Sequence, residues 1–293
     1  MKQKKGIPMA LRSMLFVPGN DANKMVKALN SGADAVVLDL ADSVPVSEKM
    51  KARKTVKDFL QELVAGTVYV RVNPCDSRYF WDDMQEIICP GLAGIILAKT
   101  ETPADVVRAN WLLKELETRK KLEPGKIELM PLIETARGIW YSYAIAQSDS
   151  RIARLAFNAL GYASDLGINV GQDEMEIFYA RSQLVLASRV AGIEPPVDTI
   201  YDDLNNMAGL FASAARGRQM GFQGKLVIHP KQVEPVNKVF SLQEEEIAFA
   251  RKAVLAFEEA LARGKAAIQV DGKMIDYPVA RRLKSMLSLI NVP

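Results

Sequence analysis

The stretch of sequence that decides the fold is residues 35–72: Ala35-Val-Val-Leu-Asp-Leu40, a charged amphipathic segment at 47–64, and Val68-Tyr-Val-Arg-Val72. Both short runs are almost continuously apolar and rich in β-branched residues, which is typical of parallel strands buried on both faces. The segment between them is long enough for a helix that leads from one parallel strand to the next. The stretch therefore predicts a β-α-β unit.

The same alternation occurs eight times, over about 230 residues, which favours a (β/α)8 TIM barrel over an open doubly wound sheet. Helical patterns are expected at Asp21–Asn30, Ser47–Val64, Pro103–Lys120, Arg137–Gln147, Asp173–Val190 and Leu204–Met220. The expected strands are Ser13–Val17, Ala35–Leu40, Val68–Val72, Gly94–Leu97, Ile127–Ile133, Leu155–Asn158, Val197–Ile200 and Lys225–Ile228.

The segment after the eighth strand exceeds what a barrel needs. Leu242–Arg263 predicts a long helix, Asp271-Gly272 predicts a turn, and a last helix is expected at Val279–Leu289. We therefore expect a barrel at 1–240, followed by a C-terminal helix and lid at 241–293 that pack on a neighbouring subunit.

Composition narrows the function classes. The 293 residues are 49% apolar and 25% charged, as in ordinary globular proteins. The 38 Lys and Arg against 35 Asp and Glu leave a net charge of +3, too balanced for a nucleic-acid-binding face. The two cysteines and the absence of any apolar run of about 20 residues predict a cytoplasmic protein without a membrane partner. A single histidine, His229, excludes sites that need two histidine ligands.

Polar side chains follow the carboxyl ends of the expected strands, where TIM-barrel enzymes carry their chemistry. Glu134 ends one apolar run, and its carboxylate is a hard oxygen ligand suited to Mg²⁺. The alternative is a helix N-terminal carboxylate beside Arg137. Asp165 is a further candidate oxygen ligand, although aspartate before a loop glycine is also a common turn residue.

Arg71 lies within an apolar strand, where its charge requires an anionic partner. A substrate carboxylate and an ion pair with Asp39 or Asp42 fit this requirement equally, and Lys99 presents the same two alternatives. The two aspartates are themselves candidate metal ligands, acceptors behind such ligands, or helix caps. Lys24, beside the turn at Pro18-Gly19-Asn20-Asp21, is a candidate phosphate contact at a helix start.

Six motifs, in order along residues 11–280, resemble the citrate lyase β-subunit-like family, which includes malyl-CoA and citramalyl-CoA lyases. They are Arg12-Ser-Met-Leu-Phe-Val-Pro-Gly19, Val37-Leu-Asp-Leu-Ala-Asp-Ser-Val44, Arg71-Val-Asn73, Pro131-Leu-Ile-Glu-Thr-Ala-Arg-Gly138, Val227-Ile-His-Pro230 and Asp271-Gly-Lys-Met-Ile-Asp276.

The resemblance implies a Mg²⁺-dependent barrel, with Mn²⁺ as an alternative cation, that forms a homotrimer or a dimer of trimers. It implies cleavage of a 3-hydroxyacyl-CoA thioester into acetyl-CoA and an oxo acid. Glu134 matches the family's metal-binding glutamate, Arg71 a catalytic and substrate-binding arginine, and Asp276 the acid/base aspartate, expected to act on a neighbouring subunit's site. The residues expected to contact the substrate are Arg12, Lys24, Asp42, Arg71 and Lys99.

Three positions depart from the family pattern. Ala41 replaces an acidic residue, Ala98 replaces the proline before Lys99, and Gly161 stands where the family has a second metal-binding aspartate. Because glycine has no side chain to ligate Mg²⁺, we expect either Asp165, one helical turn on, or water and substrate to complete the site.

Citramalyl-CoA is the first choice of substrate. Three alternatives stay open: a citrate lyase β subunit acting on a citryl thioester, an acyl-CoA thioesterase, and a catalytically degenerate acyl-CoA-binding protein, which Gly161 and Ala41 favour.

Overall fold

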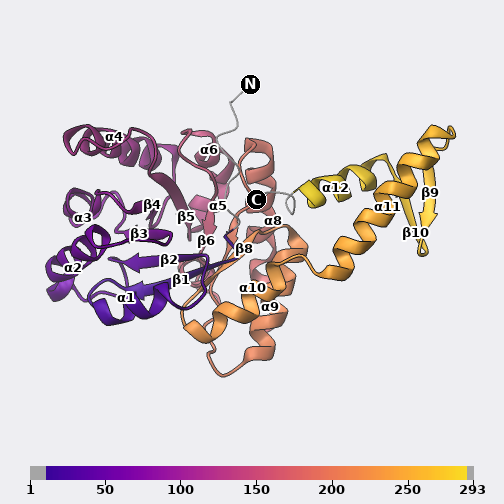
Figure 1. Cartoon of the computed structure of the whole chain (residues 1–293). Helices are drawn as coiled ribbons and strands as arrows, with labels where there is room; N and C mark the ends of the chain where they lie inside the picture. The colour runs from indigo at the N-terminus through magenta and orange to yellow at the C-terminus, as the bar shows by residue number, and fades with distance from the viewer. Residues whose placement is uncertain (1–10, 289–293) are drawn as a thin grey trace. The chain divides into compact units, whose positions relative to one another are not determined.

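The computed structural model describes residues 11–288. Eight strands pair in chain order, each parallel to the next, and β8 pairs with β1 to close a barrel (Figure 1). This confirms the predicted TIM-barrel fold. The strands are β1 (Ser13–Pro18), β2 (Ala35–Asp39), β3 (Val68–Val72), β4 (Leu92–Leu97), β5 (Glu128–Ile133), β6 (Ala156–Phe157), β7 (Val197–Asp198) and β8 (Gly224–Val227).

Two apolar layers hold the barrel together, because successive side chains of a strand point to opposite faces. Along β1, Met14 belongs to the cluster inside the barrel and Leu15 to the larger cluster between strands and helices. Both are almost fully buried. The continuous apolar runs of the sequence follow from this burial on both faces.

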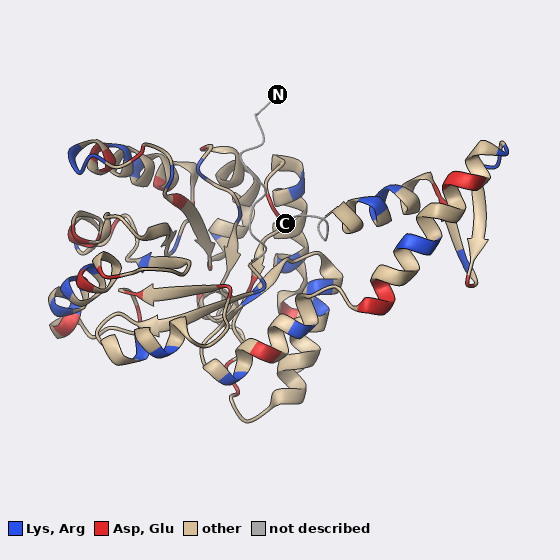
Figure 2. Ribbon diagram, in the orientation of Figure 1, with Lys and Arg blue, Asp and Glu red and all other residues tan. Residues whose placement is uncertain are grey.

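Helices surround the barrel and carry interspersed charges of both signs (Figure 2). Three of them, α3, α7 and α10, lie outside the helical ranges expected from the sequence, and the helix expected at 137–147 is divided at Tyr141. The helices are α1 (Ala22–Leu29), α2 (Lys49–Gln61), α3 (Phe80–Ile87), α4 (Pro103–Arg119), α5 (Ala136–Trp140), α6 (Ser142–Gln147), α7 (Ala159–Leu166), α8 (Phe178–Ala191), α9 (Met207–Met220) and α10 (Val233–Phe240), with 3₁₀ turns η1 (Val46–Glu48), η2 (Met175–Ile177) and η3 (Pro230–Gln232).

The chain divides into two compact units, Met1–Phe240 and Ser241–Pro293. The second unit contains α11 (Glu244–Ala262), a hairpin of β9 (Ala267–Val270) and β10 (Lys273–Asp276), and α12 (Tyr277–Ser288). Asp271 and Gly272 both have positive φ at the hairpin turn, a conformation that Asp-Gly adopts readily. Within residues 11–288, no helix is long and apolar enough to cross a membrane.

Candidate active site

The register of β2 and β3 sets Asp39 directly opposite Arg71 at the carboxyl end of the barrel. The guanidinium binds Asp39 through two hydrogen bonds, Nε to Oδ1 and Nη2 to Oδ2, both 2.6 Å. Its Nη1 donates to Asp42 Oδ2 at 2.8 Å. Burial acts to lower the pKa of Arg71, but its hydrogen bonds to Asp39 and the charge of that carboxylate raise the pKa above its ordinary value. The ion pair considered for Arg71 is therefore present.

The ion pair with the two aspartates leaves some N–H donors of the Arg71 guanidinium available to a ligand. A guanidinium has five N–H donors, and three are used by the two aspartates. The side chain of Asp42 is 80% exposed, so its bond to Arg71 is open to displacement by another carboxylate. Arg71 thus combines a fixed attachment to Asp39 with a free edge.

Asp39 is anchored by the loop that follows β2. Its carboxylate accepts hydrogen bonds from the backbone N–H of Ala41 at 2.9 Å and of Ser43 at 3.0 Å. Burial acts to raise the pKa of Asp39, but the bonds and positive charge of Arg71 hold it below its ordinary value. Asp39 therefore stays ionised and fixes the guanidinium.

Glu134 follows β5 immediately and is almost fully buried. Its Oε1 accepts from the backbone N–H of Lys99 at 2.7 Å, and its Oε2 accepts from Asn158 Nδ2 at 2.6 Å. Within residues 11–288 no salt bridge of Glu134 is found, and Arg137, the expected neighbour, lies 3.8 Å from Glu101. Burial raises the pKa of Glu134, which these hydrogen bonds only partly offset.

Lys99 and Lys24 follow β4 and β1 at this end of the barrel. Lys99 adopts a φ of 50°, and its backbone N–H, not its ammonium, contacts Glu134. The Lys24 ammonium lies 3.2 Å from Asp21 and its side chain is 62% exposed. Substrate contact by either ammonium stays a prediction.

The Asp165 carboxylate is hydrogen-bonded to the start of α5. It lies in α7, and its Oδ2 accepts from the backbone N–H of Ala136 at 2.8 Å, so it stabilises the start of α5. No group of three or more His, Cys, Asp or Glu side chains suited to a metal occurs in the described part of the chain. The role of Asp165 as a metal ligand stays a prediction.

Arg12 is also absent from this site. It precedes β1 and so lies at the amino end of the barrel, where it binds Asp34 through Nη2 at 2.7 Å and Nε at 2.9 Å. Substrate contact by Arg12 stays a prediction.

Asp276 ends β10 in the second unit. There its Oδ1 accepts from the backbone N–H of Val279 at 3.0 Å, which caps the start of α12. Its acid/base role stays a prediction.

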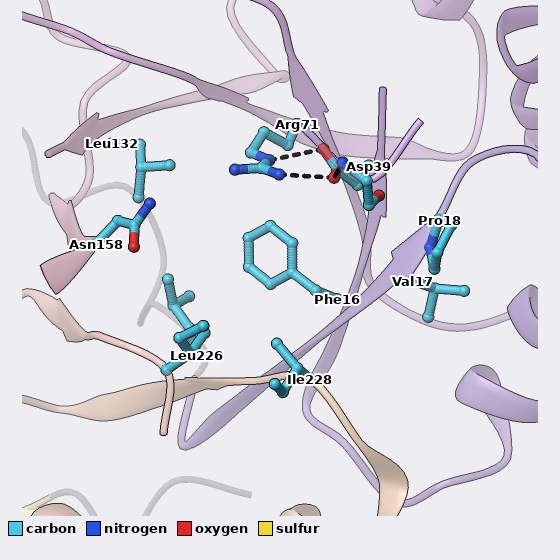
Figure 3. Close-up of a pocket in the computed structure, with 11 residues that line it drawn as sticks. Phe16, Val17, Pro18, Asp39, Arg71, Leu132, Asn158, Leu226 and Ile228 are labelled. Atoms are coloured by element: carbon cyan, nitrogen blue, oxygen red, sulfur yellow. Dashed lines mark hydrogen bonds and ion pairs between the residues drawn. The ribbon is translucent and has the colours of Figure 1, made fainter. Parts of the chain in front are cut away.

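A cavity of about 250 Å³ opens at the barrel mouth beside these groups. Figure 3 shows the Arg71 guanidinium bound to Asp39 on one side, with its remaining edge toward the side of Asn158. Among the described residues that line it, Arg71 is the one Lys or Arg. Most of the wall is apolar, formed by Phe16, Val17, Pro18, Leu132, Ile200, Leu226 and Ile228.

Asn158 is the site residue that the sequence did not reveal. It was expected to end a strand, but it precedes α7 and its side chain accepts from Gly161 N at 3.4 Å. Asparagine is a preferred residue at this helix position, and this was the available signal.

A model of the HpcH/HpaI aldolase/citrate lyase family matches residues 12–230. The chain belongs to this family. Citrate lyase subunit beta of Leuconostoc mesenteroides subsp. cremoris is 34% identical over 282 residues, covering 96% of this chain and 93% of the relative. The human protein named citramalyl-CoA lyase, mitochondrial, is 29% identical over 294 residues, covering 95% and 85%. These names confirm the predicted carbon–carbon lyase class at the level of the HpcH/HpaI family.

Solved structures of HpcH/HpaI family members agree. CitE from Mycobacterium tuberculosis, in complex with magnesium, acetoacetate and coenzyme A, superposes with a TM-score of 0.79 at 26% identity, covering 96% of this chain and 98% of that one. A citrate lyase from Burkholderia xenovorans LB400 gives 0.83 at 18% identity and supports the fold alone. The predicted cofactors, Mg²⁺ and coenzyme A, are thus present in a relative.

Proposed function

We propose that this protein cleaves a 3-hydroxyacyl-CoA of the citramalyl-CoA type into acetyl-CoA and an oxo acid that carries one carboxylate and a small apolar group. The observation that carries the proposal is the cavity, which combines one guanidinium with a mostly apolar wall. The free edge of Arg71 suits one carboxylate, because a planar fork binds carboxylates in a defined geometry. The apolar wall suits the methyl group of pyruvate, the oxo-acid product of citramalyl-CoA.

The reaction requires removal of one proton and placement of one electron pair. A base takes the proton of the 3-hydroxyl, the carbon–carbon bond breaks, and its electron pair passes to the thioester enolate. The enolate then takes a proton to become acetyl-CoA. Arg71 holds the carboxylate throughout, and we assign the base to Asp276 from a neighbouring subunit of a homotrimer.

Glu134 would hold the cation. It is a buried carboxylate whose contacts are N–H donors and not a cation, and Mg²⁺ in proteins is bound through one or two carboxylates with water and substrate oxygens completing the shell. When bound, Mg²⁺ acts as a Lewis acid that stabilises negative charge on substrate oxygens.

The test is incubation with citramalyl-CoA, malyl-CoA and citryl-CoA, with and without Mg²⁺. Pyruvate, glyoxylate, oxaloacetate, acetyl-CoA and free thiol are measured separately. We expect pyruvate and acetyl-CoA in equal amounts from citramalyl-CoA. Free thiol without acetyl-CoA would identify a thioesterase, and no turnover of any ester would identify an acyl-CoA-binding protein; either result overturns the proposal.

A citryl thioester is the second candidate, favoured by the greater identity to citrate lyase β subunits, 34% against 29% for citramalyl-CoA lyase. Its oxo-acid product has two carboxylates, for which the cavity offers one guanidinium. Release of oxaloacetate from citryl-CoA at a higher kcat/KM than pyruvate from citramalyl-CoA would favour this candidate.

The Asp276 assignment is tested by mixing subunits. Asp276→Ala and Glu134→Ala proteins, each inactive alone, are refolded together, and mixed trimers are identified by native mass spectrometry. We expect partial recovery of activity, because some sites then combine an intact Glu134 with an intact Asp276. Mixed trimers without recovery would remove Asp276 from the neighbouring site.

A further inference from the structure

We propose that the magnesium site of this chain is completed by the substrate, and that Asn158 is the residue that prevents the cation from binding alone. This inference rests on the proposed function and concerns the same site. It follows from what surrounds the Glu134 carboxylate.

Both oxygens of Glu134 already accept hydrogen bonds from N–H groups. The amide of Asn158 presents the positive end of its dipole to Oε2 at 2.6 Å, and the backbone N–H of Lys99 does the same to Oε1 at 2.7 Å. A cation that approaches Oε2 therefore meets a like-signed group and must compete with it. Asn158 lines the cavity, so it stands between Glu134 and the space that a ligand enters.

In this structure the other carboxylates at the mouth, among the described residues, are each bound to another group. A Cβ atom at Gly161 would lie 2.8 Å from Glu134 Oε2 and 3.2 Å from Asn158 Nδ2, so the first turn of α7 brings bare backbone against the carboxylate. Asp39 and Asp42 are bound to Arg71, and Asp165 to the start of α5.

One carboxylate, partly satisfied by N–H donors, binds Mg²⁺ weakly because the affinity of such sites rises with the number of charged ligands. The missing ligands are then the carboxylate and 3-oxygen of the substrate. Cation and substrate consequently raise each other's affinity by the same factor, as thermodynamic linkage requires.

The test replaces Asn158 by the isosteric aspartate. Asn158→Asp sets a second carboxylate at the cavity, and it preserves α7 because aspartate caps helices as well as asparagine does. Binding of Mn²⁺, as a spectroscopic substitute for Mg²⁺, is followed by electron paramagnetic resonance without substrate and with pyruvate plus coenzyme A. The matched control is Asn206→Asp, since Asn206 caps α9 through Gly209 N at 2.8 Å.

We expect the wild type to bind Mn²⁺ measurably only when pyruvate and coenzyme A are present. Asn158→Asp binds Mn²⁺ alone at least about tenfold more tightly than the wild type, whereas Asn206→Asp matches the wild type. Tight binding of Mn²⁺ alone by the wild type, or no gain in Asn158→Asp with native circular dichroism, overturns the inference. If Asn158→Asp binds Mn²⁺ alone but the wild type cleaves no CoA ester, the proposed function fails and the assignment of Asn158 stands.

Discussion

Two groups of buried charges in the barrel unit differ in one respect. Behind β7 and β8, Asp198 binds Arg181 at 2.9 Å and Lys225 at 3.1 Å, and Glu174 binds Arg181 at 2.7 Å. Two carboxylates there face two fully buried cations, and the partly exposed Arg216 lies 3.8 Å from Glu174. At the mouth, Asp39 and Asp42 share Arg71, and Glu134 has hydrogen-bond donors but no cation.

The difference separates structural from functional charge. A buried ion group with balanced charge compensates the cost of desolvation within the fold itself. Burial raises the pKa of Glu134, and its hydrogen bonds and the charge of Arg71 offset this only partly, whereas the neighbouring cations hold the pKa of Asp198 below its ordinary value despite complete burial. Because the burial of Glu134 is only partly compensated, its carboxylate at the barrel mouth is available to a ligand that brings positive charge.

Asp198→Asn removes one carboxylate from the balanced group. The change leaves Arg181 and Lys225 with Glu174 as their one carboxylate, an uncompensated buried positive charge. We expect a loss of about 3–5 kcal/mol in the free energy of unfolding, measured by urea denaturation. Turnover per folded molecule stays close to that of the wild type. A loss of stability below about 1 kcal/mol would show that the group is not a structural unit.

Glu134→Gln tests the barrel mouth, where we expect the change to lower activity more than stability. The amide retains the shape but cannot hold a cation, so we expect kcat/KM to fall by about 10²–10³-fold. We expect the free energy of unfolding to fall by about 1–3 kcal/mol at most, because no ion pair is lost and one of the two N–H donors to Glu134 loses its acceptor. Asp165→Asn is the matched control: it changes a helix cap, and its kcat/KM stays within about threefold of the wild type. Equal losses in the two variants would contradict the placement of the site.

The sequence predicted the strands well for a physical reason. Burial on both faces requires continuous apolar runs, and these are visible at Val68–Val72, where prediction and structure coincide. The pairing of Arg71 with Asp39 was one of two open alternatives, because it depends on strand register. Lys99 acts through its backbone and Asp165 through a helix start, and neither contact is encoded in residue type. Such contacts became visible only with the folded chain.

Arg71→Lys tests whether the planar guanidinium holds the substrate carboxylate. Lysine keeps the positive charge but loses the planar fork, so it cannot bind Asp39 through two bonds and present a free edge together. We expect kcat/KM to fall by about 10–10²-fold through misplacement of the substrate carboxylate. Steady-state kinetics with citramalyl-CoA measures the effect. Unchanged kinetics would leave Arg71 with its structural ion pair alone.

The smallest expected effect concerns pH and uses a second balanced pair, Glu117 and Arg151, joined at 2.7 Å through Oε1 and Nη1. Burial acts to raise the pKa of Glu117, but the bonds from Arg151 lower it below the ordinary value. A carboxyl group with a lowered pKa contributes stability above its unfolded pKa, about 4.3, and loses it as pH falls through the folded value. We therefore expect Glu117→Gln to be less stable than the wild type at pH 7, and the two proteins to converge as pH falls toward 3.

Urea unfolding at a series of pH values measures this difference in stability, with Glu134→Gln as control. Because the pKa of Glu134 is shifted upward, ionisation of this group lowers stability as pH rises, so the stability of Glu134→Gln relative to the wild type changes with pH in the opposite direction to that of Glu117→Gln. A constant difference between Glu117→Gln and the wild type at all pH values would mean that the pair contributes through packing and not through charge.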